Sequence, residues 1–296
     1  MSPSKVSEIK WDDFQNTIDG KPRGSKEKHH GTNPATGEQL WAVPIATQQD
    51  VDDAVVSAQK AFEKWRYVPM NERKQKLQKL KEAYMAHVDE ITELLKQETG
   101  KPHQFAAFEA QGIALWFDHH DKLELPEERE EDDDKVMTTR YTPLGVVGAI
   151  CPWNFPIVLA LGKIIPALLT GNTIIVKPSP YTPYTTLKIV EIAQEVFEPG
   201  VVQAVGGDDK LGPMLTAHPG IAKISFTGSI ATGKKIMAAC ANTLKRVTLE
   251  LGGNDASVVC EDVDIKKVAP ELAMGAFQNS GQVCVATKRI FIHEKM

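Results

Sequence analysis

Cys284 has the side chain best suited to covalent chemistry in this sequence. It lies in the stretch NSGQVCVATKR, which is polar, contains a glycine and ends in the basic pair Lys288 and Arg289. Solvent and nearby positive charge both favour the thiolate, which is the form of cysteine that attacks an electrophile. The alternative is a buried structural cysteine. For one thiol considered alone this alternative is favoured, because free cysteine is among the most buried residue types.

Glu250 and Asn154 could assist such a nucleophile. Glu250 ends the β-branched run RVTLE and comes shortly before two glycines, so its carboxylate is expected at the carboxyl end of a strand, where parallel sheets bind ligands. There it can activate a water molecule as a general base. Asn154 lies between two prolines in CPWNFP, and its amide can donate to a developing oxyanion. Considered alone, Glu250 could equally cap a helix or form a salt bridge, and Asn154 is more typical of a structural turn.

Two further segments are typical of contacts to a phosphate-bearing cofactor. Lys177 follows an apolar run in VKPSP, and the stretch FTGSIATG places Gly228 and Gly233 at the start of a predicted helix. A glycine-containing turn from strand to helix presents backbone N–H groups to a phosphate. The spacing is G-x-x-x-x-G, so the dinucleotide fingerprint G-x-G-x-x-G is absent. Neither segment is decisive by itself.

These residues lie in a region where predicted strands and helices alternate, which is typical of βαβ units and predicts a parallel sheet with helices on both faces. The predicted strands are 146–150, 173–176, 201–205, 223–226, 246–251, 257–260 and 289–293, and the predicted helices are 156–169, 185–197, 231–242 and 268–278. Because ligands bind at the carboxyl ends of parallel strands, we expect the chemistry at that edge.

The preceding part of the sequence is mainly helical. Thr47 and Asp50 form a capping-box pattern that predicts a helix ending before Pro69. A longer amphipathic run from about Asn71 to Gly100 predicts one further helix. The acidic segment EEREEDDD at 127–134 predicts a solvated loop or hairpin rather than an acidic interaction tail.

Composition excludes several classes of protein. The 296 residues predict one large α/β domain or two smaller ones, and 42% hydrophobic with 25% charged residues is ordinary for a globular chain. A net charge of −5 argues against nucleic acid as a partner. Four separated cysteines, without CxxC or histidines at ligand spacing, predict neither a disulfide framework nor a metal site.

The location of the protein is expected to be cytoplasmic, because the N-terminal stretch lacks the apolar segment of a secretory signal. Residues 141–162 carry no charge and are long enough to cross a bilayer. Prolines interrupt this segment, so it predicts a strand, a turn and a buried helix rather than a membrane span.

Five motifs taken together indicate a family. PWNFP, VKPS, FTGS, ELGGN and GQVC occur in this order and at this spacing in the aldehyde dehydrogenase superfamily, which the chain resembles from about Gly20 to its end. The resemblance implies a Rossmann-like cofactor domain, a catalytic domain, NAD or NADP as cofactor and an aldehyde as substrate. It also implies that Cys284 is the nucleophile, Glu250 the general base for thioester hydrolysis and Asn154 the oxyanion donor.

The same resemblance implies a set of cofactor contacts, with Lys177 at the adenosine ribose. The other implied contacts are Trp153, Gly207, Gly228, Ser229, Leu251 and Gly252. The implied domains are a cofactor-binding domain at 1–121 and 143–253, an acidic β-arm for oligomerisation at 122–142, and the truncated start of a catalytic domain at 254–296. We expect a homo-oligomer or pairing with a longer paralogue.

The chain departs from the family in two places. Where many members have a glutamate that accepts from the ribose hydroxyls and would repel a 2′-phosphate, this chain has Pro180, which weakens the usual argument for NAD over NADP. The resemblance alone implies NAD first, with NADP as an alternative. The sequence also ends shortly after Cys284, whereas members of the family continue, and the part beyond carries the glutamate that holds the nicotinamide ribose. Two hypotheses follow: an aldehyde dehydrogenase, or a truncated pseudoenzyme that binds nucleotide or a full-length paralogue.

Overall fold

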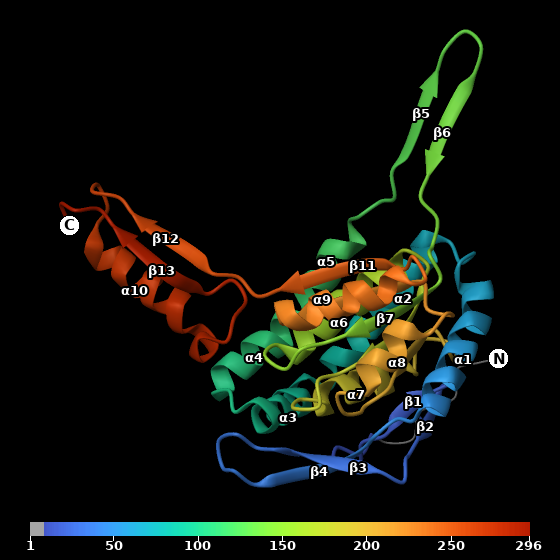
Figure 1. Cartoon of the computed structure of the whole chain (residues 1–296), viewed down its shortest axis with the longest axis horizontal. Helices are drawn as coiled ribbons and strands as arrows, with labels where there is room; N and C mark the ends of the chain where they lie inside the picture. The colour runs from blue at the N-terminus through green and yellow to red at the C-terminus, as the bar shows by residue number, and fades with distance from the viewer. Residues whose placement is uncertain (1–8) are drawn as a thin grey trace.

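A seven-stranded sheet forms the centre of the molecule (Figure 1). The computed structural model describes residues 9–296. The strands lie in the order β11-β10-β7-β8-β9-β1-β2, and the five from β7 to β11 are parallel, as the sequence predicts. Their bounds are Asn16–Ile18 for β1, Lys21–Arg23 for β2, Val146–Ile150 for β7, Thr173–Lys177 for β8, Val202–Ala204 for β9, Lys223–Gly228 for β10 and Arg246–Leu251 for β11.

Helices cover both faces of this sheet, and alternate residues of its central strands β7 and β8 enter separate cores. On β7, Val147 and Ala149 pack in one apolar cluster, and Val146 and Ile150 pack in the other. The second cluster is covered by α1 (Gln48–Trp65), α8 (Leu211–Ala217) and α9 (Ile230–Ala241). The first contains α2 (Met70–Met85), α3 (Val88–Thr99), α4 (His103–Gly112), α5 (Ala114–Asp121), α6 (Pro156–Leu169) and α7 (Tyr184–Ala193).

The prediction of one long helix from Asn71 to Gly100 is wrong. The segment forms two helices, α2 and α3, separated at His87, whose φ of −119° and ψ of 18° are not helical. Both helices bury their apolar faces in the same core cluster, so the helical spacing of apolar residues continues across the break. The predicted capping box at Thr47 is confirmed, since Thr47 and Asp50 bond reciprocally at the start of α1.

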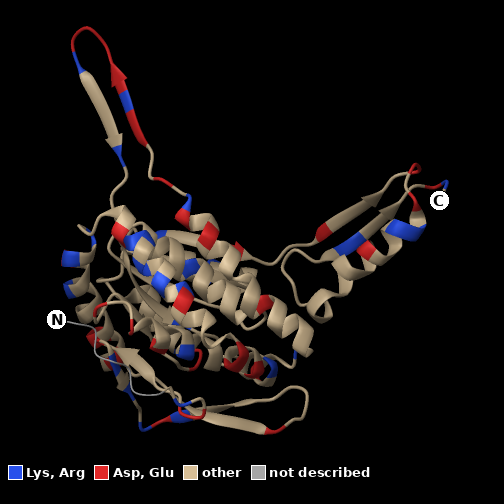
Figure 2. Ribbon diagram, turned by 180° about the vertical axis from the view of Figure 1, so that it is seen from behind, with Lys and Arg blue, Asp and Glu red and all other residues tan. Residues whose placement is uncertain are grey.

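Two hairpins extend from the core. One pairs β3 (Lys28–Thr32) with β4 (Gln39–Pro44), and the other pairs β5 (Glu127–Glu131) with β6 (Val136–Arg140). The second hairpin protrudes as an arm in which every strand residue is exposed, and its acidic strand β5 is visible in Figure 2. The hairpin expectation for the acidic segment is therefore confirmed.

The last part of the chain forms a small separate lobe (Figure 1). It contains β12 (Asp255–Val259), parallel to β13 (Thr287–Ile292), together with α10 (Ile265–Phe277) and the short 3₁₀ helix η1 (Gln278–Gly281). Helix α10 buries none of its residues. Several large apolar side chains of the lobe are exposed: Val258, Ile265, Met274, Phe277, Val285, Ile290, Phe291 and Ile292.

The uncharged stretch 141–162 forms β7, a turn and the buried helix α6, as the positions of its prolines predict. No helix within residues 9–296 has the length and apolar character needed to cross a bilayer.

Candidate active site

A cavity of about 280 Å³ lies beside the carboxyl ends of β7, β10 and β11 and the loop that follows η1. The three predicted catalytic residues, Cys284, Glu250 and Asn154, all line it. Five of the predicted cofactor contacts line it as well: Trp153, Gly228, Ser229, Leu251 and Gly252. A larger hollow lies at the amino ends of β7 and β10, lined by Gln59, Lys60 and Leu144 among others, and none of the residues lining it is a cysteine.

The loop that carries Cys284 begins with an unusual backbone. Asn279, Ser280 and Gly281 have φ values of 51°, 59° and 75°, a left-handed run that turns the chain after α10. Cys284 is exposed, whereas Cys151 and Cys240 are buried. Cys260, expected at the end of a strand, instead follows β12 and is exposed, because β12 ends at Val259.

The side chain of Lys288 bonds to the backbone of this loop. Its Nζ donates to the carbonyl oxygens of Val283 at 3.1 Å, Cys284 at 3.3 Å and Ala286 at 3.1 Å, and it lines the same cavity. The sequence indicates positive charge near Cys284 but not this arrangement. A lysine in a polar, exposed segment gives no signal that its ammonium bonds to three carbonyls of its own loop.

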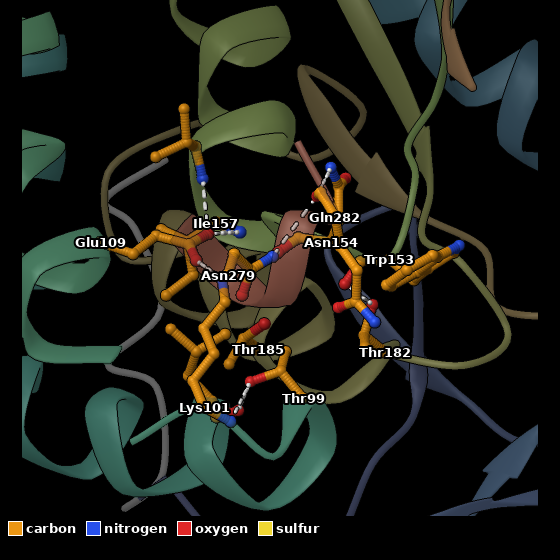
Figure 3. A network of polar contacts seen from close by, with 12 residues as sticks. Thr99, Lys101, Glu109, Trp153, Asn154, Ile157, Thr182, Thr185, Asn279 and Gln282 are labelled. Atoms are coloured by element: carbon orange, nitrogen blue, oxygen red, sulfur yellow. Dashed lines mark hydrogen bonds and ion pairs between the residues drawn. The ribbon is translucent and has the colours of Figure 1, made fainter. Parts of the chain in front are cut away.

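Asn154 also contacts this loop. Its Nδ2 donates to the carbonyl oxygen of Gln282 at 2.8 Å, and the Nδ2 of Asn279 donates back to the carbonyl oxygen of Asn154 at 3.3 Å (Figure 3). A side-chain amide has two N–H donors, so one remains for a ligand in the cavity. The turn after β7 is thereby joined to the loop of Cys284.

Glu250 lies near the end of the edge strand β11 and is exposed, with Thr227 of β10 as its partner in register. Beneath it, the buried Lys163 of α6 donates to Thr227 Oγ1 at 2.7 Å. Burial lowers the pKa of Lys163, and electrostatic interactions with Cys151 and Glu250 oppose that shift. The sequence analysis did not identify Lys163. A single lysine within the apolar run IVLALGKIIPALL is the signal that could have indicated it.

The turn from β10 to α9 presents a helix N-terminus to the cavity. Ser229 caps α9 by accepting from Thr232 N at 3.2 Å. A Cβ added to Gly228 would lie 2.5 Å from the Phe226 ring, so only glycine lets the strand enter this turn undisturbed. The N–H groups of the first turn of α9 suit an anionic group such as a phosphate.

Lys177 and Gly207 do not line the cavity. Lys177 is the last residue of β8 and Gly207 follows β9, at the same edge of the sheet. Lys177 is buried, and within residues 9–296 its Nζ has one hydrogen-bond partner, the carbonyl oxygen of Pro178 at 3.1 Å. Burial lowers its pKa, while Asp209 and Asp208 act in the opposite direction. A buried ammonium with N–H groups to spare suits ligand hydroxyls, so these donors fit a dinucleotide.

No group of three or more His, Cys, Asp or Glu side chains in the described part of the chain could hold a metal ion.

Comparisons with known proteins agree with this geometry. The model of the aldehyde dehydrogenase family matches residues 22–296. The FUS7 protein of Gibberella fujikuroi is 50% identical over 286 residues, which are 97% of this chain and 62% of that protein. Aldehyde dehydrogenase LUC3 of a Fusarium species is 49% identical over 280 residues, which are 95% of this chain and 60% of that protein.

Solved structures show the same fold. An NAD⁺ complex of aldehyde dehydrogenase from Bacillus cereus superposes with a TM-score of 0.89 at 34% identity, over 95% of this chain and 60% of that chain. An E. coli NADP dependent enzyme gives a TM-score of 0.92 at 31% identity, over 98% and 62%. The chain thus spans about three fifths of the length of these relatives. Since the family model matches nearly the whole sequence, the chain belongs to the aldehyde dehydrogenase family.

Proposed function

We propose that this chain carries the nucleophile, the base and the oxyanion donor with which an NAD(P)-dependent dehydrogenase oxidises an aldehyde to a carboxylic acid. The observation that supports this proposal is the cavity at which Cys284, Asn154 and Glu250 converge from three separate segments. The proposed substrate is a small-molecule aldehyde, and the proposed location is the cytoplasm, where a thiol stays reduced.

In the first step, the thiolate of Cys284 adds to the aldehyde carbonyl, forming a C–S bond and placing negative charge on the oxygen. The free N–H of the Asn154 amide and the backbone N–H of Cys284 stabilise this oxyanion. The adduct then loses a hydride, which NAD or NADP accepts when bound, and a thioester remains on Cys284. Glu250 takes a proton from a water that attacks the thioester, so that the acid leaves and the thiolate is restored.

The cofactor would be held along the carboxyl edge of the sheet. Lys177 suits the adenosine ribose, Gly207 and the α9 N-terminus with Gly228 and Ser229 suit the adenine and pyrophosphate, and Trp153, Leu251 and Gly252 border the position of the nicotinamide. Pro180 offers neither an acceptor for the ribose hydroxyls nor a charge that repels a 2′-phosphate. We propose NAD first because of the family resemblance, and NADP as a close competitor because Pro180 removes the usual discrimination against it.

A second candidate function is a pseudoenzyme that binds nucleotide or a full-length paralogue without catalysis. The observation that favours it concerns the lobe of β12, β13 and α10. Its residues 281–284 and Lys288 line the cavity, yet helix α10 buries none of its residues. In this case the exposed apolar side chains of the lobe would contact a longer relative. The acidic arm at 122–142 is the proposed site of association between copies.

Steady-state formation of NADH or NADPH from short, long and aromatic aldehydes tests the two functions, with Cys284→Ala as the blank. Turnover that disappears in Cys284→Ala supports the dehydrogenase. Binding of either nucleotide by calorimetry, without turnover of any aldehyde, supports the pseudoenzyme. Absence of both binding and turnover would contradict each of them.

A further inference from the structure

A buried ion pair lies directly behind the turn that carries Asn154. Glu109 of α4 pairs with Lys101, and their side chains are 0% and 3% exposed. The second carboxylate oxygen of Glu109 accepts from the backbone N–H of Ile157 at 3.0 Å and of Val158 at 3.3 Å (Figure 3). Neither charged residue lines the cavity, and the proposed reaction does not use them.

Glu109 supplies the N-terminal cap that the N-cap residue of α6 does not provide. The N-cap residue of that helix, Phe155, makes no side-chain capping bond, so the first N–H groups of α6 depend on a partner from outside the helix. A carboxylate at this end also interacts favourably with the helix dipole. Glu109 therefore fixes where α6 begins, one residue after Phe155 and two after Asn154.

Lys101 holds the same turn through an aromatic ring. Its Nζ lies 4.0 Å from the centroid of the Phe155 ring, a cation–π geometry. The residue next to Asn154 is therefore held on two sides, by Glu109 through the backbone of α6 and by Lys101 through the ring. Asn154 in turn donates to Gln282 in the loop of Cys284.

Burying such a pair requires removing two charges from water, and this desolvation opposes stabilisation of the core. Burial raises the pKa of Glu109 and lowers the pKa of Lys101, and each partner opposes the shift of the other. Well-packed apolar residues in place of a buried ion pair are often equally stable or more so. What apolar residues could not supply is a directed acceptor for the two N–H groups of α6.

We propose that Glu109 and Lys101 are positioning residues that hold Asn154 at the distance from Cys284 required to stabilise an oxyanion. This inference rests on the proposed function, because it needs Asn154 to be the oxyanion donor. The contacts run from Glu109 to the N-terminus of α6, from Lys101 to Phe155, and from Asn154 to the Gln282 carbonyl.

Two reactions of Cys284 separate this role from a purely structural one, and neither needs the cofactor. p-Nitrophenyl acetate acylates the thiol through a tetrahedral oxyanion and releases p-nitrophenolate. Iodoacetamide alkylates the same thiol by displacement of iodide at a saturated carbon, with no oxyanion. The ratio of the two rate constants therefore reports oxyanion stabilisation, while a general change in thiol exposure alters both rates together. A Cys260→Ser background removes the other exposed thiol.

The test variant is the double substitution Glu109→Gln with Lys101→Met, which leaves no unpaired buried charge. We expect its acylation-to-alkylation ratio to fall about 10- to 100-fold, since misplacement by about 1 Å can cost roughly a hundredfold in rate. Asn154→Ala, which removes the donor itself, should lower the ratio about 100- to 1000-fold. The matched control is Glu98→Gln, because Glu98 is an equally buried carboxylate that caps α7 instead of α6.

A ratio within twofold of the parent chain in the folded double variant would overturn the proposal, as would an equal fall in Glu98→Gln. If the double variant does not fold, Phe155→Leu removes the ring beneath Lys101 and leaves the ion pair in place. It should lower the ratio several-fold, and an unchanged ratio counts against the proposal. A ratio that does not change even in Asn154→Ala would show that the proposed oxyanion role fails, whereas an effect in Asn154→Ala alone rejects only the positioning role.

Discussion

The amide Nδ2 of Asn154 donates to the backbone carbonyl oxygen of Gln282 at 2.8 Å, across 128 positions of sequence. This bond joins the turn after β7 to the loop of Cys284, which belongs to the separate C-terminal lobe. The proposed oxyanion donor and the proposed nucleophile are thus held in register by one hydrogen bond between side chain and backbone. Asn279 strengthens the junction, since its amide donates to the carbonyl of Asn154.

The four thiols should differ in reactivity according to burial. Burial raises the pKa of Cys151 to about 11 and also raises the pKa of Cys240, so both are protonated at neutral pH. Cys284 and Cys260 are exposed. Limited alkylation of the folded protein followed by peptide mapping should label these two first, and all four in urea. Early labelling of Cys151 or Cys240 in the folded protein would contradict the buried positions found here.

Glu98 should make stability depend on pH. Burial raises its pKa to about 8, although hydrogen bonds from Thr185 and from the backbone of Tyr184 oppose the shift. An ordinary carboxyl in the unfolded chain titrates near 4.3. Because the folded state binds the proton more tightly, the stabilising contribution is complete below about pH 4 and is lost as the pH rises through about 8.

Comparison with Glu98→Gln isolates this effect, since glutamine keeps the shape of a neutral carboxyl but does not titrate. The difference in unfolding free energy between the two proteins should change by on the order of a few kcal/mol between pH 5 and pH 8, in favour of the variant at the higher pH. Urea unfolding at several pH values measures it. A difference that is independent of pH would show that Glu98 titrates normally.

Pro180 should narrow the preference between the two cofactors. Replacing it with glutamate adds an acceptor for the ribose hydroxyls, which contributes about 0.5–1.5 kcal/mol to NAD binding. The same carboxylate repels a 2′-phosphate, so binding of NADP should weaken. Calorimetric titration of the parent chain and Pro180→Glu with both nucleotides measures the change, with Lys177→Met as a control that weakens both. A parent preference for NAD beyond about a hundredfold would mean that another residue discriminates.

The predictions that succeeded rest on short-range patterns. The apolar run of β8 (Thr173–Lys177) and the capping box at Thr47 are local, because a buried parallel strand and a helix start each depend on a few neighbouring residues. The resemblance implied that Cys284, Glu250 and Asn154 form one site, and all three line one cavity. The rule that parallel sheets present ligands at one edge accounts for Glu250 and Asn154 but not for Cys284, which lies outside the sheet.

What the sequence did not reveal depends on contacts between distant segments. Glu109 accepts from the N–H of Ile157, 48 positions later, and it lies in a stretch with no capping pattern of its own. Helix α4, which carries it, was missed because Gly100 and Pro102 indicate a helix end, whereas Pro102 is also the N-cap of the next helix. Lys288 bonds to three carbonyls of its own loop, a conformation that residue types alone do not specify.

The C-terminal lobe should be the least stable part of the 296-residue chain. A two-stranded sheet with one helix is marginal by itself, and β12, β13 and α10 leave most of their apolar side chains exposed. Local opening there should cost little free energy compared with opening of the buried strands β7 and β8. We therefore expect amide hydrogens of β12 and β13 to exchange within minutes and those of β7 and β8 to persist for hours, as hydrogen-exchange mass spectrometry measures.

Local opening of this lobe would affect catalysis, because the lobe carries Cys284 while Asn154 and Glu250 lie on the main sheet and its turns. The chain alone should therefore show little or no turnover with any aldehyde, since displacement of the thiol by about 1 Å can cost roughly a hundredfold in rate. Turnover near one per second, abolished by Cys284→Ala, together with slow exchange in β12 and β13, would show that the lobe is held firmly without further chain. Rapid exchange confined to the lobe, with the nucleotide still bound, is the result that this structure predicts.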